Sequence, residues 1–267
     1  MSITNDKREL IIDTHGHIQD HDYPAGSTVF VDAGTMVDAL DRHGITEIWV
    51  SPVSAMVRGS DCAYHNKKQY EQFKKPYPDR FRNYAVFSPY YGKEMREDIK
   101  RCFEEYGFEA IKIHSWVQGF GLHQPVMYEI MEAAVKYNVP VMFHDGTPPY
   151  ADTLQIASLA QRYPESKVLL GHAGLYDSYR SAIQACNAHD NVWLILIGPI
   201  TGDMREILRD ARHDRLLFGT DYCCAGDGWV GESIIADRIN IIKFACPDKE
   251  LYDLIMYKNA QTLMGII

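Results

Sequence analysis

Short runs of apolar and β-branched residues alternate along the chain with segments in which apolar residues recur at helical spacing. The runs return at intervals of about 25 to 35 residues, as repeated βα units do. They predict strands near residues 10–17, 46–52, 81–89, 108–115, 139–145, 167–173, 192–198 and 216–222. The intervening segments predict helices near 35–43, 93–106, 126–138, 152–163, 203–212, 232–245 and 249–264.

Several of these strand-like runs are apolar throughout rather than alternating. The clearest is Val192–Ile197, which suits a parallel strand that is covered on both faces. Eight strands, each followed by a helix in about 250 residues, predict an α/β protein with a single-domain (β/α)8 TIM barrel. We expect that domain to span residues 1–267. A doubly wound open sheet is the alternative.

Polar residues that could bind a metal ion stand at the ends of four of these runs. They are His15 and His17 in the first run, His144 in the fifth, His172 in the sixth and Asp221 in the eighth. The first, fifth, sixth and eighth strands can converge only if the sheet closes. The C-terminal ends of barrel strands are also where barrel enzymes build their active sites. The positions of these residues therefore favour the barrel over the open sheet.

The residue types at these strand ends suit metal binding. His15 and His17 are two positions apart, so an extended strand presents both imidazoles on one side. Neutral imidazole is the commonest metal ligand among side chains. Asp221 follows a wholly apolar run, where an unpaired carboxylate is costly and a cation is its expected partner. The alternative for Asp221 is a helix N-cap.

Composition and charge exclude several classes of partner. The 267 residues carry a net charge of -9 and no run of Lys or Arg, which argues against nucleic acid. No apolar run approaches the roughly 20 residues of a membrane helix, and no signal peptide is recognisable. The 6 cysteines are scattered, which is typical of a reduced cytoplasmic protein. We expect a small-molecule substrate and leave a homo-oligomer open.

Several motifs together resemble the amidohydrolase-related branch of the amidohydrolase superfamily. They are Ile12–His17, Ile111–His114, Phe143–His144, Gly171–Gly174 and Phe218–Tyr222, with Lys258–Leu263 similar to the branch's closing helix. This resemblance implies a TIM barrel that binds one divalent ion, zinc first and manganese next. The ligands that it implies are His15, His17, His144 and Asp221. His144 taken alone could also be a core histidine.

The resemblance also implies roles around that ion. His172 is expected to act as general acid/base or electrostatic stabiliser, with metal ligation as the alternative. Lys112 and His114 share one face of the fourth strand and are expected to line the substrate pocket. In relatives with two metals, a lysine on this strand is carbamylated and bridges them, which is the alternative for Lys112. Asp13 lies two positions before His15, so the two share a face of the strand, and Asp13 is expected to point into the barrel as a hydrogen-bond acceptor.

Loops that follow the strands are expected to recognise the substrate. Trp116 lies in a long aromatic loop that suits stacking on a planar or apolar substrate. Arg58 could pair with a substrate carboxylate, and a solvated loop arginine is the alternative.

The expected reaction is hydrolysis of a small-molecule carboxamide, ester or lactone by a metal-activated water, with Asp221 as the proton shuttle. The alternative is metal-dependent, non-oxidative decarboxylation of an aromatic or unsaturated carboxylic acid. The same five residues would serve both reactions. A second alternative is a metal-free binding module on a degenerate barrel, which the complete ligand set disfavours.

Overall fold

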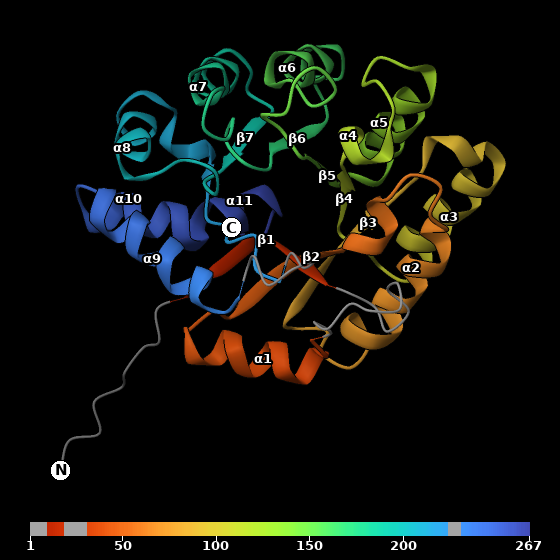
Figure 1. Cartoon of the computed structure of the whole chain (residues 1–267), viewed down its shortest axis with the longest axis horizontal. Helices are drawn as coiled ribbons and strands as arrows, with labels where there is room; N and C mark the ends of the chain where they lie inside the picture. The colour runs from red at the N-terminus through yellow and green to blue at the C-terminus, as the bar shows by residue number, and fades with distance from the viewer. Residues whose placement is uncertain (1–9, 19–30, 224–230) are drawn as a thin grey trace.

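A computed structural model describes residues 10–18, 31–223 and 231–267 of the chain. Its strands form one eight-stranded sheet in which each strand pairs in parallel with the next along the sequence (Figure 1). The strands are β1 (Ile12–Ile18), β2 (Glu47–Pro52), β3 (Phe81–Val86), β4 (Ala110–Ile113), β5 (Pro140–Phe143), β6 (Lys167–Leu170), β7 (Val192–Ile195) and β8 (Leu216–Leu217).

Hydrogen bonds between β1 and the segment that follows β8 bring the two ends of the sheet together. Thr14 N donates to Phe218 O at 2.9 Å, and Asp221 N donates to His15 O at 2.8 Å. The sheet is therefore a nearly closed barrel. The predicted (β/α)8 TIM barrel is confirmed, and the open-sheet alternative is wrong.

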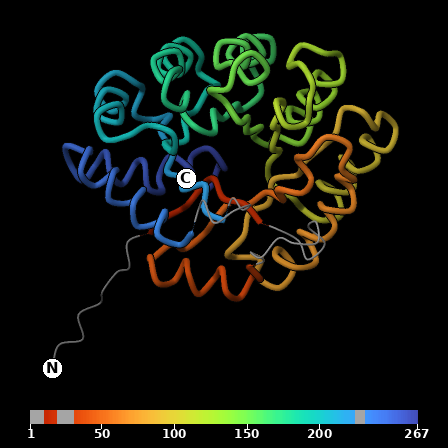
Figure 2. Tube along the Cα trace, in the orientation of Figure 1, coloured from red at the N-terminus to blue at the C-terminus, as the bar shows by residue number. Residues whose placement is uncertain are grey.

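Helices surround the strands as an outer ring, and the chain runs once around the barrel so that its last helices lie beside β1 (Figures 1 and 2). The α-helices are α1 (Ala33–Arg42), α2 (Cys62–Gln69), α3 (Gly92–Glu104), α4 (Ser115–Gln118), α5 (Pro125–Tyr137), α6 (Thr153–Arg162), α7 (Tyr179–Ala188), α8 (Thr201–Asp210), α9 (Ser233–Ala245), α10 (Lys249–Asp253) and α11 (Asn259–Leu263). Shorter helical turns are η1 (Val53–Met56), η2 (Tyr70–Lys74), η3 (Pro89–Tyr91), η4 (His213–Arg215) and η5 (Leu254–Lys258). No helix of the described residues is long and apolar enough to cross a membrane.

Alternate residues of the strands pack into two different cores, because successive side chains of a strand point to opposite faces. One set, which includes Val141 and Leu194, packs against the surrounding helices. The other set, which includes Trp49 and Met142, packs inside the barrel together with residues of α11. The strands are thus covered on both faces, as their continuous apolar runs predict.

The strand predictions run too far at their C-terminal ends. The strands β4, β5, β6 and β8 stop before His114, His144, His172 and Asp221 respectively, so these residues belong to the segments that follow the strands. The backbone turns shortly after two of these ends, with positive φ angles of 47° at Ala173 and 63° at Asp221, so a ladder cannot continue through these residues. Three helices, α2, α4 and α7, were not among those expected, and α4 occupies part of the segment that was interpreted as a loop.

Candidate metal centre

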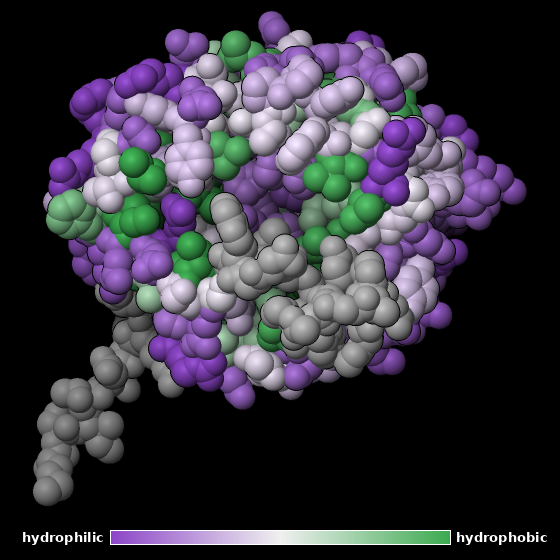
Figure 3. Space-filling view, viewed as in Figure 1, coloured by the Kyte–Doolittle hydropathy of each residue, from purple (hydrophilic) through white to green (hydrophobic). Residues whose placement is uncertain are grey.

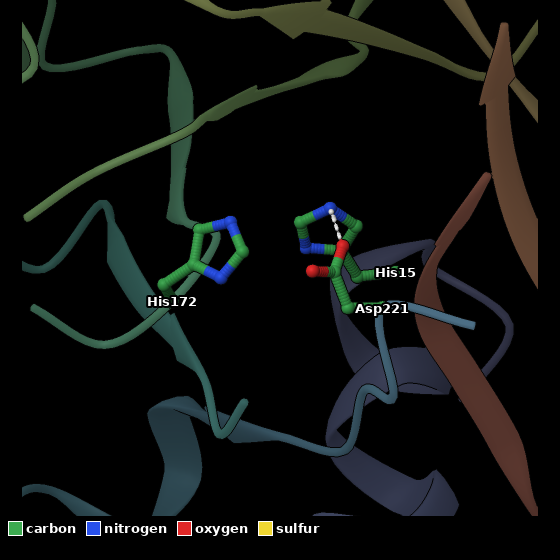
Figure 4. Close-up of side chains that lie close together, drawn as sticks. All are labelled: His15, His172 and Asp221. Carbon is green, nitrogen blue, oxygen red and sulfur yellow. Dashed lines mark ion pairs between the residues drawn. The ribbon is translucent and has the colours of Figure 1, made fainter. Parts of the chain in front are cut away.

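The strand β1 supplies two buried imidazoles whose Nε2 atoms lie 3.2 Å apart, those of His15 and His17. Oδ1 of Asp221 lies 3.0 Å from His17 Nε2 and 3.4 Å from His15 Nε2. Figure 4 shows the Asp221 carboxylate directed at the ring of His15. Closure of the barrel between β1 and the segment after β8 brings these ligand atoms together.

The other ring nitrogen of each β1 histidine is held by the surrounding fold. His15 Nδ1 donates to the carbonyl oxygen of Gly171 at 3.0 Å, and His17 Nδ1 is hydrogen-bonded to Ser51 Oγ at 3.1 Å. Such contacts fix the tautomer and direct both Nε2 atoms at the centre.

Asp13 is buried and acts as an acceptor, as expected, but it does not hold a ligand ring. Its carboxylate accepts from the backbone N–H of His15 and of Thr220, and from the hydroxyl of Thr220. Burial raises the pKa of Asp13 to about 7. Asp13 therefore joins β1 to the segment that carries Asp221 and fixes the spacing of the two.

Asp221 adopts a left-handed backbone with φ 63°, and its backbone N–H donates to His15 O. The alternative of a helix N-cap at Asp221 concerns residues 224–230, which lie outside the described residues. No described group forms a hydrogen bond with its buried Oδ1. This oxygen, close to two imidazole nitrogens, suits a cation.

His172 lies close enough to His15 and Asp221 to bind the same metal ion. One ligand atom from each of His15, His172 and Asp221 lies within 4.8 Å of the others (Figure 4). The small residues Gly171 and Gly174 flank this histidine, and Gly174 adopts φ 84°. The cluster supports ligation by His172 alongside the acid/base role.

His144 follows β5 and packs between two other imidazoles. Its ring stacks on His114, with centroids 3.9 Å apart, and meets the ring of His172 at 4.3 Å. Its buried Nε2 has no hydrogen-bond partner among the described residues. A buried imidazole nitrogen without a hydrogen bond, next to the cluster, is available to bind a metal ion.

Lys112 on β4 is completely buried, and its Nζ donates to His15 Nε2 at 3.2 Å. Burial holds the pKa values of His15, His144 and His172 well below their usual range. Nearby cationic groups, among them Lys112, lower these pKa values further. Neutral imidazole is the form that binds metal, so these histidines are prepared for ligation at neutral pH.

The other predicted site residues lie around this centre. Burial lowers the pKa of His114 to about 3, and its ring lies 6.2 Å from that of Trp116 in α4. The Trp116 side chain is 56% exposed, which leaves its face open to a ligand. Arg58 is exposed, with its guanidinium 5.6 Å from the centre of the Tyr90 ring. Figure 3 shows a hollow near the middle of this side of the molecule, with hydrophilic residues inside it.

Asp145 is a residue of the centre that the sequence interpretation missed. Its carboxylate accepts from the backbone N–H of His172 and of Gly174, both at 2.7 Å, and so fixes the segment that carries His172. Burial raises the pKa of Asp145 to about 6. Its place directly after His144, at the end of an apolar run, was a signal of the kind that identified Asp221.

The donor set fits a divalent cation. It consists of neutral imidazoles, a carboxylate and two buried atoms that lack hydrogen bonds among the described residues, His144 Nε2 and Asp221 Oδ1. Zinc and manganese both accept such nitrogen and oxygen ligands.

Comparison with known proteins gives a family match over most of the chain. Residues 12–266 match the model of the family described as Amidohydrolase. A gamma-resorcylate decarboxylase from Polaromonas sp. is 22% identical over 277 residues, which cover 80% of this chain and 84% of that protein.

Solved structures share the fold. The 2,6-dihydroxybenzoate decarboxylase from Rhizobium has a TM-score of 0.76 at 16% identity and covers 97% of this chain and 99% of its own. The 5-carboxyvanillate decarboxylase from Novosphingobium aromaticivorans, complexed with manganese, has a TM-score of 0.74 at 16% identity, with 96% of each chain covered. A probable 2-pyrone-4,6-dicarboxylic acid hydrolase from Acinetobacter baumannii has a TM-score of 0.71 at 17% identity and covers 96% and 99%. At these identities the likeness concerns the fold.

Proposed function

Because the chain belongs to the amidohydrolase family, we propose that it is a metal-dependent, non-oxidative decarboxylase of a hydroxylated aromatic carboxylic acid. The reaction is the one that the sequence offered as the alternative to hydrolysis. A decarboxylase among the sequence relatives and two among the similar structures support this order of preference.

The balance of charge in the centre carries the proposal. Lys112 is buried beside His15, and a divalent cation bound by the cluster adds two positive charges. Among the described residues, the ligand cluster contains one carboxylate, that of Asp221. Asp13 and Asp145 direct their carboxylates at backbone N–H groups rather than into the ligand cluster. Positive charge in the centre attracts an anion, and of the two reactions only decarboxylation requires a carboxylate on every substrate.

The residues divide the work as follows. His15, His17, His144 and Asp221 would hold the ion, with His172 as the alternative ligand that the cluster supports. When bound, the ion supplies positive charge that orients the substrate carboxylate and a neighbouring oxygen. Asp221 or His172 delivers a proton to the ring carbon that bears the carboxylate. The bond between that carbon and the carboxylate then breaks, its electron pair restores the aromatic ring, and CO2 leaves. Each turnover thus consumes one proton, which the solvent returns to the acid.

Hydrolysis of a lactone, ester or amide is the second candidate. The likeness to a probable pyrone hydrolase favours it, and the same histidines and Asp221 would serve it. Zinc remains the metal that the ligand types favour, and the manganese complex of a similar structure supports manganese as well.

Product analysis separates the two reactions. Protein loaded with zinc or with manganese is incubated with 2,6-dihydroxybenzoate, with other hydroxybenzoates and with 2-pyrone-4,6-dicarboxylate, and CO2 and organic products are quantified. We expect CO2 and the decarboxylated phenol in equal amounts, and, in D2O, deuterium at the carbon that lost the carboxylate. The His15→Ala protein is the inactive control. Opening of the lactone without release of CO2 would establish the hydrolase instead. Absence of all turnover, with metal content that cannot be restored, would favour the binding module.

A further inference from the structure

Arg238 is a cationic side chain that no part of the proposed mechanism uses. It lies on α9, the helix that follows β8, and its Nη1 donates to the carbonyl oxygen of Pro199 at 3.2 Å. Pro199 belongs to the connection between β7 and α8, so this contact fixes the guanidinium against a segment that follows a barrel strand.

That connection packs directly on the segment that carries His172. A Cβ atom at Gly198 would lie 2.6 Å from the carbonyl oxygen of His172, so the two backbones are in close contact. Arg238 is therefore joined through Pro199 to the wall of the metal centre.

The electrostatic surroundings of Arg238 agree with this position. Burial lowers its pKa, and the charges of Tyr176, Asp221 and Asp237 act in the opposite direction. Tyr176 follows β6 and is largely exposed, and Asp237 precedes Arg238 on α9. The guanidinium thus lies where the field of Asp221 reaches it, and an arginine remains cationic at such a site.

One nitrogen of this guanidinium lacks a partner among the described residues. Its Nε is buried and has no hydrogen-bond partner among the described residues, whereas Nη1 is occupied by Pro199. A buried N–H without a partner costs free energy. The edge formed by Nε and Nη2 is also the one that binds a carboxylate through two parallel hydrogen bonds.

We propose that Arg238 recognises the carboxylate of the substrate at the edge of the metal centre, from its anchor on the connection that packs against the segment of His172. The inference rests on the proposed function in that it takes the substrate to be a carboxylic acid. Arg238 then selects the acid over its uncharged analogues. Departure of the carboxylate as neutral CO2 removes the group that Arg238 binds, so the product leaves more readily than the substrate.

Calorimetric binding to the metal-loaded protein tests this assignment. The probes are 2,6-dihydroxybenzoate and 1,3-dihydroxybenzene, which differ by the carboxylate. We expect Arg238→Gln to weaken binding of the acid about 10- to 100-fold, as loss of a charge-assisted hydrogen bond does, with the neutral diol unaffected. Arg238→Lys should recover part of the affinity. Where the acid is turned over, KM should rise more than kcat falls.

The matched control is Arg205→Gln, because Arg205 on the neighbouring helix α8 is exposed and stacks on Phe244 of α9. It should bind both probes as the wild type does. Equal weakening of acid and diol by Arg238→Gln, unchanged binding of the acid, or a wild type that binds no acid would each overturn the assignment. Selective loss of acid binding in a protein that releases no CO2 would uphold Arg238 and reject the decarboxylase.

Discussion

His15 illustrates how a single buried imidazole is prepared for a cation. Its Nδ1 is committed to the carbonyl oxygen of Gly171, which directs Nε2 to the centre. Burial and the charge of Lys112 keep the ring neutral. The neighbouring Asp221 is held in the left-handed region by its position between β8 and α9, a conformation that Asp and Asn tolerate better than most residues.

For this reason, Asp221→Asn should keep the fold and the backbone conformation. The amide cannot accept or deliver the proton, so turnover should fall about 10²- to 10⁴-fold, or roughly 3 to 5 kcal/mol in the barrier. Circular dichroism, metal content and kcat check this expectation. Near wild-type turnover at full metal occupancy would show that Asp221 is not the proton carrier and would transfer that role to His172.

The His172→Asn protein completes the test, because loss of metal there indicates ligation and retained metal indicates the acid/base role.

At the scale of elements, short contacts between successive βα units set the positions of the ligands. Gly171 is the clearest case, because a Cβ atom there would lie 2.7 Å from the carbonyl oxygen of Phe143 and 3.3 Å from Cε1 of His15. The β5 backbone, the β6 segment and the His15 ring therefore meet at a point that admits only glycine.

Gly171→Ala should consequently separate β6 from β5 and turn the His15 ring. We expect a loss of about 1–3 kcal/mol in the free energy of unfolding, together with weaker metal binding. Urea unfolding and metal titration measure the two effects. Gly202→Ala is the control, since no atom lies within 4 Å of a Cβ at this position of α8. Similar stability of the Gly171→Ala protein and the wild type would refute the close contact.

Asp98 on α3 makes a second link between elements. It accepts from Asn66 Nδ2 at 2.8 Å, and Asn66 in turn is hydrogen-bonded to both backbone groups of Val86 in β3. Burial raises the pKa of Asp98 above its ordinary value of 3.8. The folded protein therefore binds this proton more tightly than the unfolded chain does.

The sign of the resulting pH dependence follows from linkage. The stability that protonated Asp98 contributes is fully present below pH 3.8 and is lost as the pH rises through the raised pKa of the folded state. The unfolding free energy of the wild type, relative to Asp98→Asn, should therefore fall with rising pH and then become constant. Urea unfolding between about pH 4 and pH 8 measures this difference, with Asp38→Asn on the exposed face of α1 as the control. A difference that does not change with pH would contradict the assignment.

For the whole molecule, closure of the barrel unites residues from both ends of the chain. His15 and Asp221 meet only because β1 lies beside β8. A cation that binds both joins the two ends of the sheet and stabilises the folded state over the unfolded chain, in which the ligands are dispersed.

Removal of the metal should therefore lower the melting temperature. At a metal concentration 100 times Kd, binding contributes about 2.7 kcal/mol, which corresponds to about 5–10 °C for a domain of this size. Calorimetry with and without a chelator measures the shift, and the chelator should lower the melting temperature of His15→Ala less than that of the wild type. Elemental analysis should give about one ion per chain in the wild type and less in His15→Ala. Equal metal content in the two proteins would refute the ligand set, whereas two ions per chain would indicate a carbamylated Lys112.

The sequence alone was sufficient for the architecture. Continuous apolar runs and their regular spacing are local properties, and they predicted the eight strands and the barrel. The same pattern placed His15 and His17 in the first strand and His144, His172 and Asp221 near the ends of later strands, and their role as a metal centre stays a prediction. Tertiary structure decided what depends on backbone turns and on contacts between distant segments. The left-handed turn at Asp221, the hold of Asp145 on the segment of His172, the partners of Asp13 and the anchoring of Arg238 on Pro199 all arise in this way. None of these contacts has a periodic signature in the sequence, because each forms only when the barrel has closed.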